Sequence, residues 1–436
     1  MTITPQSYVF QNGQLKLTAK KYTTKQSPKN ASGVTLMFAH CIGSHKEQWE
    51  PIIEQLFHHQ QSKVDPFHRI REAWAFDWQS HGDAALLNAQ VLQEREDTVS
   101  AFEWADAIAT FVAWLLKHEP NHRLVAVGHS AGAGAMTLTT KALVSPQLSP
   151  YPYSALILVE PTIVTWELFH QHHDDRIESM HLAVSSTSMR RDSWPSRDNA
   201  FQYFKKRWPW SQWDERVLRL YCEHGLHSVS EQVSPRLPSS APSSSSPSVP
   251  FSTPSINPSI TSYKTAVTLK CNRNHEALSF PDADPHFESA IQLSRISHIL
   301  PVHIIWGSQN EIVPEFIQDS LSDTSAGRFT ASVTRIPDGG HLLVQEQPDK
   351  VAEVICNIID TLSPSHTTSS SSASPFAAES SSPFSSSTSP MGVREPPLSS
   401  PSSRSDPHAK PNTPPASRVQ RIQKPTGHRL PASSRL

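Results

Sequence analysis

Short runs of consecutive apolar residues recur at intervals along this chain. They are VTLMFAH at 34–40, EAWAFD at 72–77, LVAVG at 124–128, ALILVE at 155–160 and VHIIWG at 302–307. Each run is too short for a helix and too continuously apolar for a strand with one face in water, which is typical of parallel strands covered on both faces. Amphipathic segments lie between the runs, most clearly at 98–118, where apolar residues recur every three or four positions. The alternation predicts an α/β fold with a doubly wound, mostly parallel sheet.

The alternation of strands and helices is interrupted once. Aromatic, helix-like pieces occupy 162–300, so we expect a helical lid inserted between two parts of the α/β core, 1–161 and 301–362. Serine and proline dominate two stretches, at about 228–262 inside the lid and from 363 to 436. Such segments bury too little apolar surface to offset the loss of chain entropy on ordering. We therefore expect both stretches to be disordered.

Composition and charge narrow the range of partners. With a formal net charge of -2 over 436 residues, the chain lacks the basic character that binding to nucleic acid requires. No segment approaches the roughly 18 to 20 apolar residues that span a bilayer, and the first residues lack the basic and apolar parts of a secretory leader. The four cysteines form no CxxC pair, which argues against a zinc or disulfide framework. We expect an intracellular protein without a transmembrane segment.

The first candidate for chemistry is Ser130 in the sequence VAVGHSAGAGAM. Here a G-x-S-x-G pattern follows an apolar strand and precedes a helix of small residues. In that context the chain reverses sharply around the serine, so only small neighbours fit and the hydroxyl is held in a strained, accessible position. The other interpretation is a glycine turn with an idle serine, but the strand and helix on either side favour a nucleophile.

A serine hydroxyl needs a base to accept its proton, and His341 is the best placed of the 23 histidines. It follows the last predicted strand in the sequence PDGGHLLVQEQP, within a glycine turn that can face the carboxyl edge of the sheet. Another histidine-rich stretch, HQHHDD at 170–175, lacks a second group of metal ligands, and a solvated helix face explains it better. We therefore expect neither a metal nor a cofactor.

Four motifs resemble those of the α/β-hydrolase superfamily: GHSAG, AHCIG at 39–43, FDWQSHGD at 76–83 and GGHLLVQEQP at 339–348. The chain is most similar to fungal peroxisomal hydrolases, of the yeast peroxisomal lipase type and of toxin biosynthesis, through AHCIGSHKEQWEP, ILVEPTI and RRDSWPS. The resemblance extends over about residues 5–362, apart from the Ser/Pro insert. It implies an α/β-hydrolase fold and acyl cleavage. A serine at the nucleophile position argues against haloalkane dehalogenases and epoxide hydrolases, which carry aspartate there.

The same resemblance assigns the oxyanion site. In such enzymes one backbone N–H comes from the loop after the first core strand, which corresponds here to Ile42. The second comes from the residue after the nucleophile, which is Ala131. Two preset donors can lower a barrier by several kcal/mol. This chain has His40-Cys41 where its relatives usually carry His-Gly.

Two residues are candidates for the acid that orients the base. Many relatives carry aspartate after the seventh strand in a pattern like W-G-x-x-D-x-I-V-P, but here WGSQNEIVP places Asn310 at that position. An amide cannot stabilise an imidazolium as a carboxylate does. Glu160 ends the run ALILVE, a position that some α/β-hydrolases use for the acid, whereas Glu311 neighbours Asn310 but points in a different direction. We favour Glu160 over Glu311 and interpret Asp338 as a turn residue.

The sequence ends in Ser434-Arg435-Leu436, which differs from the peroxisomal signal Ser-Lys-Leu only by arginine for lysine. A tripeptide of this kind at the end of a Ser/Pro-rich tail is accessible to a receptor. We therefore expect a peroxisomal import receptor as a partner and the peroxisome as the location.

Together these residues predict a serine hydrolase in which Ser130 attacks an acyl carbonyl, His341 carries the proton and Glu160 orients His341. The expected substrates are small acyl compounds, either lipid esters or acyl-CoA thioesters, cleaved through an acyl-enzyme. Two alternatives remain. One is a catalytically silent, hydrolase-like binding protein, favoured by Asn310 and Cys41, and the other is an acyltransferase, which would use the same residues.

Overall fold

The computed structural model of this chain describes three stretches, which lie in one compact unit: 2–143, 152–232 and 263–362. Most of the inner Ser/Pro stretch (233–262) and the whole tail (363–436), with the targeting tripeptide, lie outside the described residues. Residues 228–232, which the composition assigned to a disordered stretch, instead belong to a β-strand.

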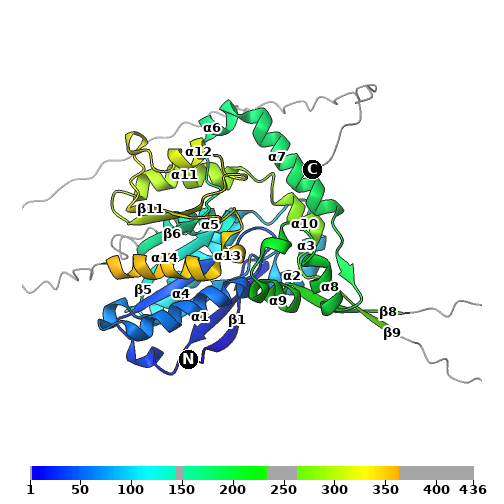
Figure 1. The fold of residues 1–436 in the computed structure, drawn as a ribbon, viewed down its shortest axis with the longest axis horizontal. Helices are drawn as coiled ribbons and strands as arrows, with labels where there is room; N and C mark the ends of the chain where they lie inside the picture. The colour runs from blue at the N-terminus through cyan, green and yellow to red at the C-terminus, as the bar shows by residue number, and fades with distance from the viewer. Residues whose placement is uncertain (1, 144–151, 233–262, 363–436) are drawn as a thin grey trace, which may run out of the picture. The chain divides into compact units, whose positions relative to one another are not determined.

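The core is a mostly parallel sheet with the strand order β1-β2-β4-β3-β5-β6-β10-β11 (Figure 1). Its strands are β1 (Thr4–Asn12), β2 (Leu15–Thr23), β3 (Val34–Ala39), β4 (Ile70–Phe76), β5 (Arg123–His129), β6 (Tyr153–Val159), β10 (Val302–Gly307) and β11 (Ser332–Ile336). The pairings β1–β2 and β2–β4 are antiparallel, and each pairing from β4 to β11 is parallel. The apolar runs of the sequence form the adjacent strands β4, β3, β5, β6 and β10. The predicted α/β sheet is confirmed.

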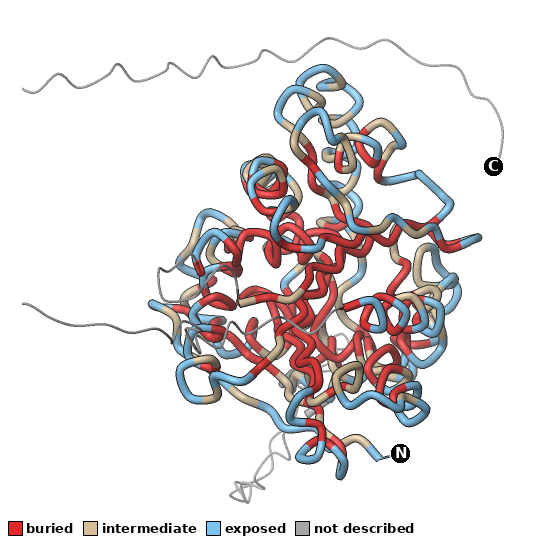
Figure 2. Tube along the Cα trace, turned by 90° about the vertical axis from the view of Figure 1, so that its left-hand side faces the viewer, coloured by how far each residue is buried: buried red, intermediate tan, exposed pale blue. Residues whose placement is uncertain are grey.

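Helices cover both faces of this sheet. The longer ones are α1 (Glu50–His59), α4 (Ala101–His118), α5 (Ala131–Ala142), α11 (Asp284–Ile296) and α14 (Pro348–Thr361), and the shorter ones are α2 (Gly82–Leu87), α3 (Ala89–Gln93), α12 (Glu315–Ser320) and α13 (Leu343–Glu346). One face packs against α4, α5 and α11, and the other against α1 and α14. In β5, Leu124 and Ala126 face the first layer while Val125 and Val127 face the second. This two-sided burial explains the continuously apolar strands, and Figure 2 shows the buried residues concentrated at the centre.

Between β6 and β10 the chain forms a further group of elements, here called the cap. The cap consists of α6 (Trp166–Gln171), α7 (His173–Met189), β7 (Ser193–Trp194), α8 (Arg197–Phe204), α9 (Glu215–His224), β8 (Leu226–Gln232), β9 (Tyr263–Leu269) and α10 (Arg273–Leu278). Its strands pair antiparallel in the order β7-β9-β8. The sequence analysis expected only helices at 162–300. It missed this sheet because β8 and β9 pair across the long Ser/Pro stretch, and it placed in the lid α11, which packs on α5 in the main core.

The aromatic residues of the cap pack mainly with one another. Trp194, Phe201, Phe204 and Tyr221 form the centre of a small separate core. Helix α7 contributes little to it, because Thr187 is the one residue of that helix that is buried. The described part of the chain contains no helix that is long and apolar enough to cross a membrane.

Candidate active site

Ser130 lies in the sharp turn between β5 and α5. Its backbone has φ +55° and ψ -119°, a strained conformation that side-chain-bearing residues rarely adopt. A Cβ built on Gly132 would lie 2.5 Å from the carbonyl oxygens of Ala39 and His40, and one on Gly128 would collide with the first turn of α5. Both glycines of GHSAG are therefore required by sterics, as the motif predicts for a turn that presents its serine.

The imidazole of His341 lies between Ser130 and Glu160. Its Nε2 is 3.0 Å from Ser130 Oγ, and its Nδ1 is 3.2 Å from Glu160 Oε2. A carboxylate only accepts hydrogen bonds, so Nδ1 carries the proton and donates to Glu160. Nε2 is then free to accept the hydroxyl proton of the serine. The structure thus brings together the three residues that the sequence analysis singled out.

Glu160 occupies the carboxyl end of β6 and is 1% exposed. Its backbone φ is +45°, and its N–H donates to the carbonyl of Ile305 at 2.8 Å. The second carboxylate oxygen, Oε1, accepts the N–H of Gly307 at 2.5 Å. With one oxygen held by the main chain of β10, the other is directed at the imidazole. Two fixed hydrogen bonds of this kind satisfy a buried carboxylate and fix its orientation.

The alternative acid lies on another side of the His341 turn. A Cβ built on Gly340 would be 2.6 Å from Glu311 Oε1, and the N–H of that glycine donates to Glu346 at 2.8 Å. Burial raises the pKa of Glu346, and the neighbouring Glu311 adds to the rise. Asn310, in the position where relatives carry aspartate, accepts a hydrogen bond from Gln318 instead. Of the two candidates, Glu160 is the carboxylate placed against Nδ1.

Asp338 has φ +58°, and its N–H donates to Ser308 Oγ at 2.9 Å. These features are those of a turn residue, which is how the sequence analysis interpreted it.

The proposed oxyanion donors lie on two neighbouring segments. Ala131 is the first residue of α5, and Ile42 lies in the loop after β3. The close approach of Gly132 to the carbonyls of Ala39 and His40 holds the start of α5 against this loop.

The left-handed residue of the loop after β3 is Gly43 (φ +75°) and not Cys41, so a side chain at position 41 does not distort the loop.

Two neutral histidines hold this loop, and the sequence analysis missed their role. His40 Nδ1–H donates to the carbonyl of Cys41 at 2.7 Å, and its Nε2 accepts the N–H of Trp78 at 3.0 Å. His81 Nε2 accepts the N–H of Gly43 at 3.1 Å. Burial lowers the pKa of His40 to about 4 and lowers that of His81 well below its ordinary value. Both histidines belong to motifs quoted above, AHCIG and FDWQSHGD, but only the fold reveals that they face the same loop.

A third neutral histidine, His129, holds the main chain of His341 in place. His129 precedes the serine, and its Nε2–H donates to the carbonyl of His341 at 2.8 Å. Burial lowers the pKa of His129 to about 3, so this ring stays neutral and acts as a structural donor. Of the histidines at 170–175, His170 lies on α6, His172 between α6 and α7, and His173 on α7. The described residues contain no cluster of three or more side chains that could hold a metal ion.

Fold and site together define the class of this protein. The model of the alpha/beta hydrolase family matches residues 36–354, which is most of the chain. The chain belongs to this family, and the α/β-hydrolase fold expected from its motifs is confirmed.

Similar proteins include fungal and peroxisomal members. A type I acyl-CoA thioesterase of Penicillium roqueforti is 26% identical over 234 residues, which is 53% of this chain and 49% of that protein. The peroxisomal membrane protein LPX1 of Saccharomyces cerevisiae is 28% identical over 170 residues, 37% of this chain and 40% of that protein. The matches thus span about half, or less, of the length of these relatives.

Among solved structures, the peroxisomal α/β-hydrolase Lpx1 of Saccharomyces cerevisiae aligns with a TM-score of 0.58. The alignment has 16% sequence identity and covers 84% of this chain and 91% of that one. At this identity the likeness establishes the fold alone. The resemblance to fungal hydrolases of the peroxisomal type is confirmed by these comparisons taken together.

Proposed function

We propose that this chain is a serine hydrolase that cleaves carboxylic esters or acyl thioesters through an acyl-enzyme. The observation that carries the proposal is the series of contacts from the hydroxyl of Ser130 through His341 to Glu160. A serine, an imidazole and a buried carboxylate in this order activate an alcohol oxygen on several unrelated folds. Membership of the alpha/beta hydrolase family supports the same conclusion.

In the proposed reaction, His341 Nε2 takes the hydroxyl proton as Ser130 Oγ attacks the acyl carbonyl carbon. Glu160 stabilises the imidazolium that forms. The carbonyl oxygen becomes negatively charged, and the backbone N–H groups of Ile42 and Ala131 are the proposed donors to it. His341 then returns the proton to the departing alcohol or thiol. A water molecule, deprotonated by the same imidazole, finally releases the acyl group as a carboxylic acid.

We propose an acyl group with an apolar chain as the substrate. One relative is a type I acyl-CoA thioesterase. In addition, Ile177, Met180 and Val184 of α7 are spaced so that they share one face of the helix, and all three are only half-buried. These three side chains are not part of the small core of the cap. The apolar face that they form is therefore suited to contact an acyl chain.

The catalytically silent alternative rested on Asn310 and Cys41. Glu160 reaches His341 without help from position 310. The loop after β3 has its left-handed residue at Gly43, so it needs no glycine at position 41. Both observations support the enzyme.

Incubation of the purified full chain with a fluorophosphonate is expected to modify Ser130. The reagent is attacked by the same activated oxygen that would attack an acyl carbon. Digestion followed by mass spectrometry locates the adduct, with heat-denatured protein as the control. The same preparation is then assayed with acyl-CoA thioesters and p-nitrophenyl esters of matched chain length. A native chain that does not label would exclude the enzyme, and labelling without thiol release from any acyl-CoA would restrict the function to esters.

We also propose that the protein is imported into peroxisomes by a receptor that binds Ser434-Arg435-Leu436. One relative, LPX1 of Saccharomyces cerevisiae, is similar both in sequence and in structure and bears the word peroxisomal in its name, which supports this location. A fluorescent protein fused to the N-terminus of the chain is expected to colocalise with a peroxisomal marker. Removal of the last three residues is expected to abolish the colocalisation. Peroxisomal fluorescence that persists without them would contradict the role of the tripeptide.

A further inference from the structure

A buried ion pair of the cap lies directly against the loop that carries Ile42. Arg190 follows the last residue of α7, and Glu276 lies in α10. Arg190 Nη1 donates to Glu276 Oε1 at 2.7 Å, and Nη2 donates to Oε2 of the same carboxylate, so the contact is bidentate. Glu276 Oε1 in turn lies so close to Gly43 that a Cβ built on this glycine would be 2.6 Å away. The carboxylate therefore packs against bare main chain.

Burial makes this pair sensitive to the loss of either charge. Glu276 is 3% exposed, and the side chain of Arg190 is 15% exposed. Burial disfavours the charged guanidinium, but the attraction of Glu276 outweighs this effect and raises the pKa of Arg190. Removing one partner of a buried pair leaves the other charge without compensation and is strongly destabilising locally. The two side chains thus form one unit.

The contact with Glu276 restricts the position of the Gly43 backbone. Its φ of +75° is one that glycine adopts readily and other residues rarely do. Its N–H is held by His81, so the carboxylate of Glu276 and the ring of His81 both contact this residue. Ile42 is joined directly to Gly43. A displacement of Gly43 therefore changes the position of the Ile42 N–H.

The cap also contacts the residues that follow Gly43. The ring of Tyr221 in α9 stacks with His45 at a centroid distance of 6.0 Å. Lys270, which follows β9, donates to Asp83 at 2.6 Å, and Asp83 also accepts from Lys46 at 2.7 Å. The far side of the loop is thus fixed by the cap as well, so the Arg190–Glu276 pair acts on a segment with little freedom to adjust.

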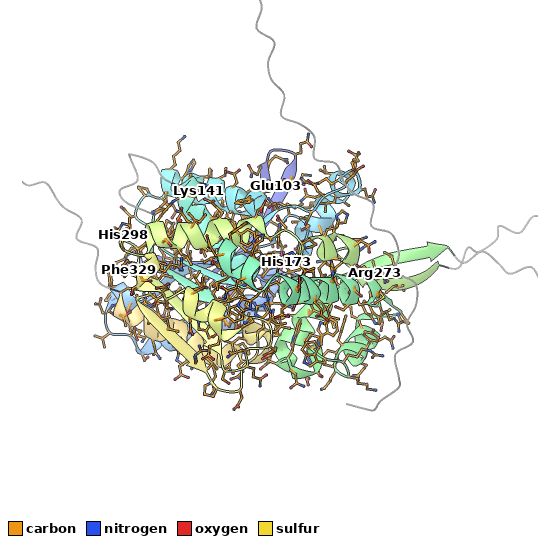
Figure 3. The ribbon with its side chains drawn as sticks, turned by 90° about the horizontal axis from the view of Figure 1, so that it is seen from above. Glu103, Lys141, His173, Arg273, His298 and Phe329 are labelled. Carbon is orange, nitrogen blue, oxygen red and sulfur yellow. The ribbon has the colours of Figure 1, made fainter. Side chains whose placement is uncertain are left out.

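The ion pair also anchors one end of α7, because Arg190 is the residue that follows this helix. In Figure 3 this helix runs from His173 toward Arg273 at the start of α10. At the end near His173, Arg176 Nη1 donates to the carbonyl of Ile312 at 3.4 Å. At the other end, Arg190 bonds to Glu276, and its carbonyl accepts from Arg273 at 2.5 Å. The placement of α7 is therefore linked to the loop after β3.

We propose that Glu276, held by Arg190, is a positioning residue for the oxyanion donor Ile42, so that the cap takes part in assembling the active site. This inference rests on the proposed serine-hydrolase function. Neither side chain contacts the reacting atoms. Their effect is on the placement of an N–H that stabilises charge in the transition state, which demands accuracy of a fraction of an ångström.

The Glu276→Gln variant tests this role, because glutamine keeps the shape of the side chain and removes the charge that holds Arg190. We expect kcat for a p-nitrophenyl ester to fall about 10- to 100-fold, somewhat less than the roughly 10²- to 10³-fold cost of deleting a donor. KM is expected to change by less than about twofold, since substrate binding is not touched. The rate of fluorophosphonate modification should fall in proportion to kcat, while its final extent stays complete. Arg190→Lys, which keeps the charge but not the bidentate contact, should give an intermediate rate.

Glu215→Gln is the matched control. Glu215 pairs with Arg219 on the exposed side of α9 in the same cap. Loss of this exposed ion pair is expected to leave kcat and the labelling rate unchanged. An unchanged kcat in Glu276→Gln would overturn the proposal. So would a drop in the final extent of labelling that accounts for the whole loss of kcat, because that pattern marks unfolding. Both outcomes presuppose an active wild type, which distinguishes them from failure of the proposed function itself.

Discussion

The Ser130→Ala variant is expected to lose about 10⁴- to 10⁶-fold in kcat on any substrate that the wild type hydrolyses. The substitution removes the atom that forms the covalent bond to the acyl carbon and leaves the imidazole of His341 without a hydroxyl to activate. Alanine meets the same strained backbone, φ +55°, as the serine it replaces, so the fold should persist. Single-turnover kinetics with a p-nitrophenyl ester measure the loss, and circular dichroism checks the fold.

Ser62→Ala provides the comparison. Ser62 is exposed, and its hydroxyl donates to the carbonyl of His59, away from the sheet edge that carries the site. We expect its kcat to equal that of the wild type. A Ser130→Ala protein that retained more than about a hundredth of the wild-type rate would indicate either another nucleophile or direct attack by water, and the acyl-enzyme scheme would have to be abandoned.

The main sheet and the turn that carries Ser130 could be predicted because both depend on local sequence. Strands buried on two faces must be apolar at every position, so the runs at 34–40 and 124–128 mark β3 and β5 directly. The turn has an equally local cause. Its glycines face the main chain of β3 and α5, and no larger residue fits there. His341 was found from its place after the last strand, since parallel strands deliver their following loops to one edge of the sheet.

The rest depends on contacts between residues far apart in the sequence. The sequence favoured Glu160 over Glu311 by analogy with other hydrolases, but the contact that decides between them is non-local: the N–H of Gly307 turns the carboxylate of Glu160 toward the base. The pairing of β8 with β9 is non-local in the same sense. So is the contact of Glu276 with Gly43, two residues separated by most of the core and the cap.

Glu160→Gln is expected to lower kcat by about 10³- to 10⁴-fold with little change in KM. Glutamine has the same shape, but it cannot stabilise the imidazolium that forms when His341 takes the proton. Its amide N–H group, if directed at the ring, would also force the wrong tautomer, with the proton on Nε2, where it cannot accept the proton of Ser130. A p-nitrophenyl ester assay is suitable because its good leaving group isolates the first proton transfer.

Glu311→Gln is the matched variant, since it makes the same chemical change at the neighbouring acidic position. Its kcat is expected to stay within about twofold of the wild type, because Glu311 lies beside Gly340 and Glu346 while Glu160 occupies the position against Nδ1. The reverse pattern, with Glu311→Gln inactive and Glu160→Gln active, would move the acid to the loop after β10. The carboxylate of Glu160 would then serve only to accept the N–H of Gly307, and its contact with His341 would have no role in catalysis.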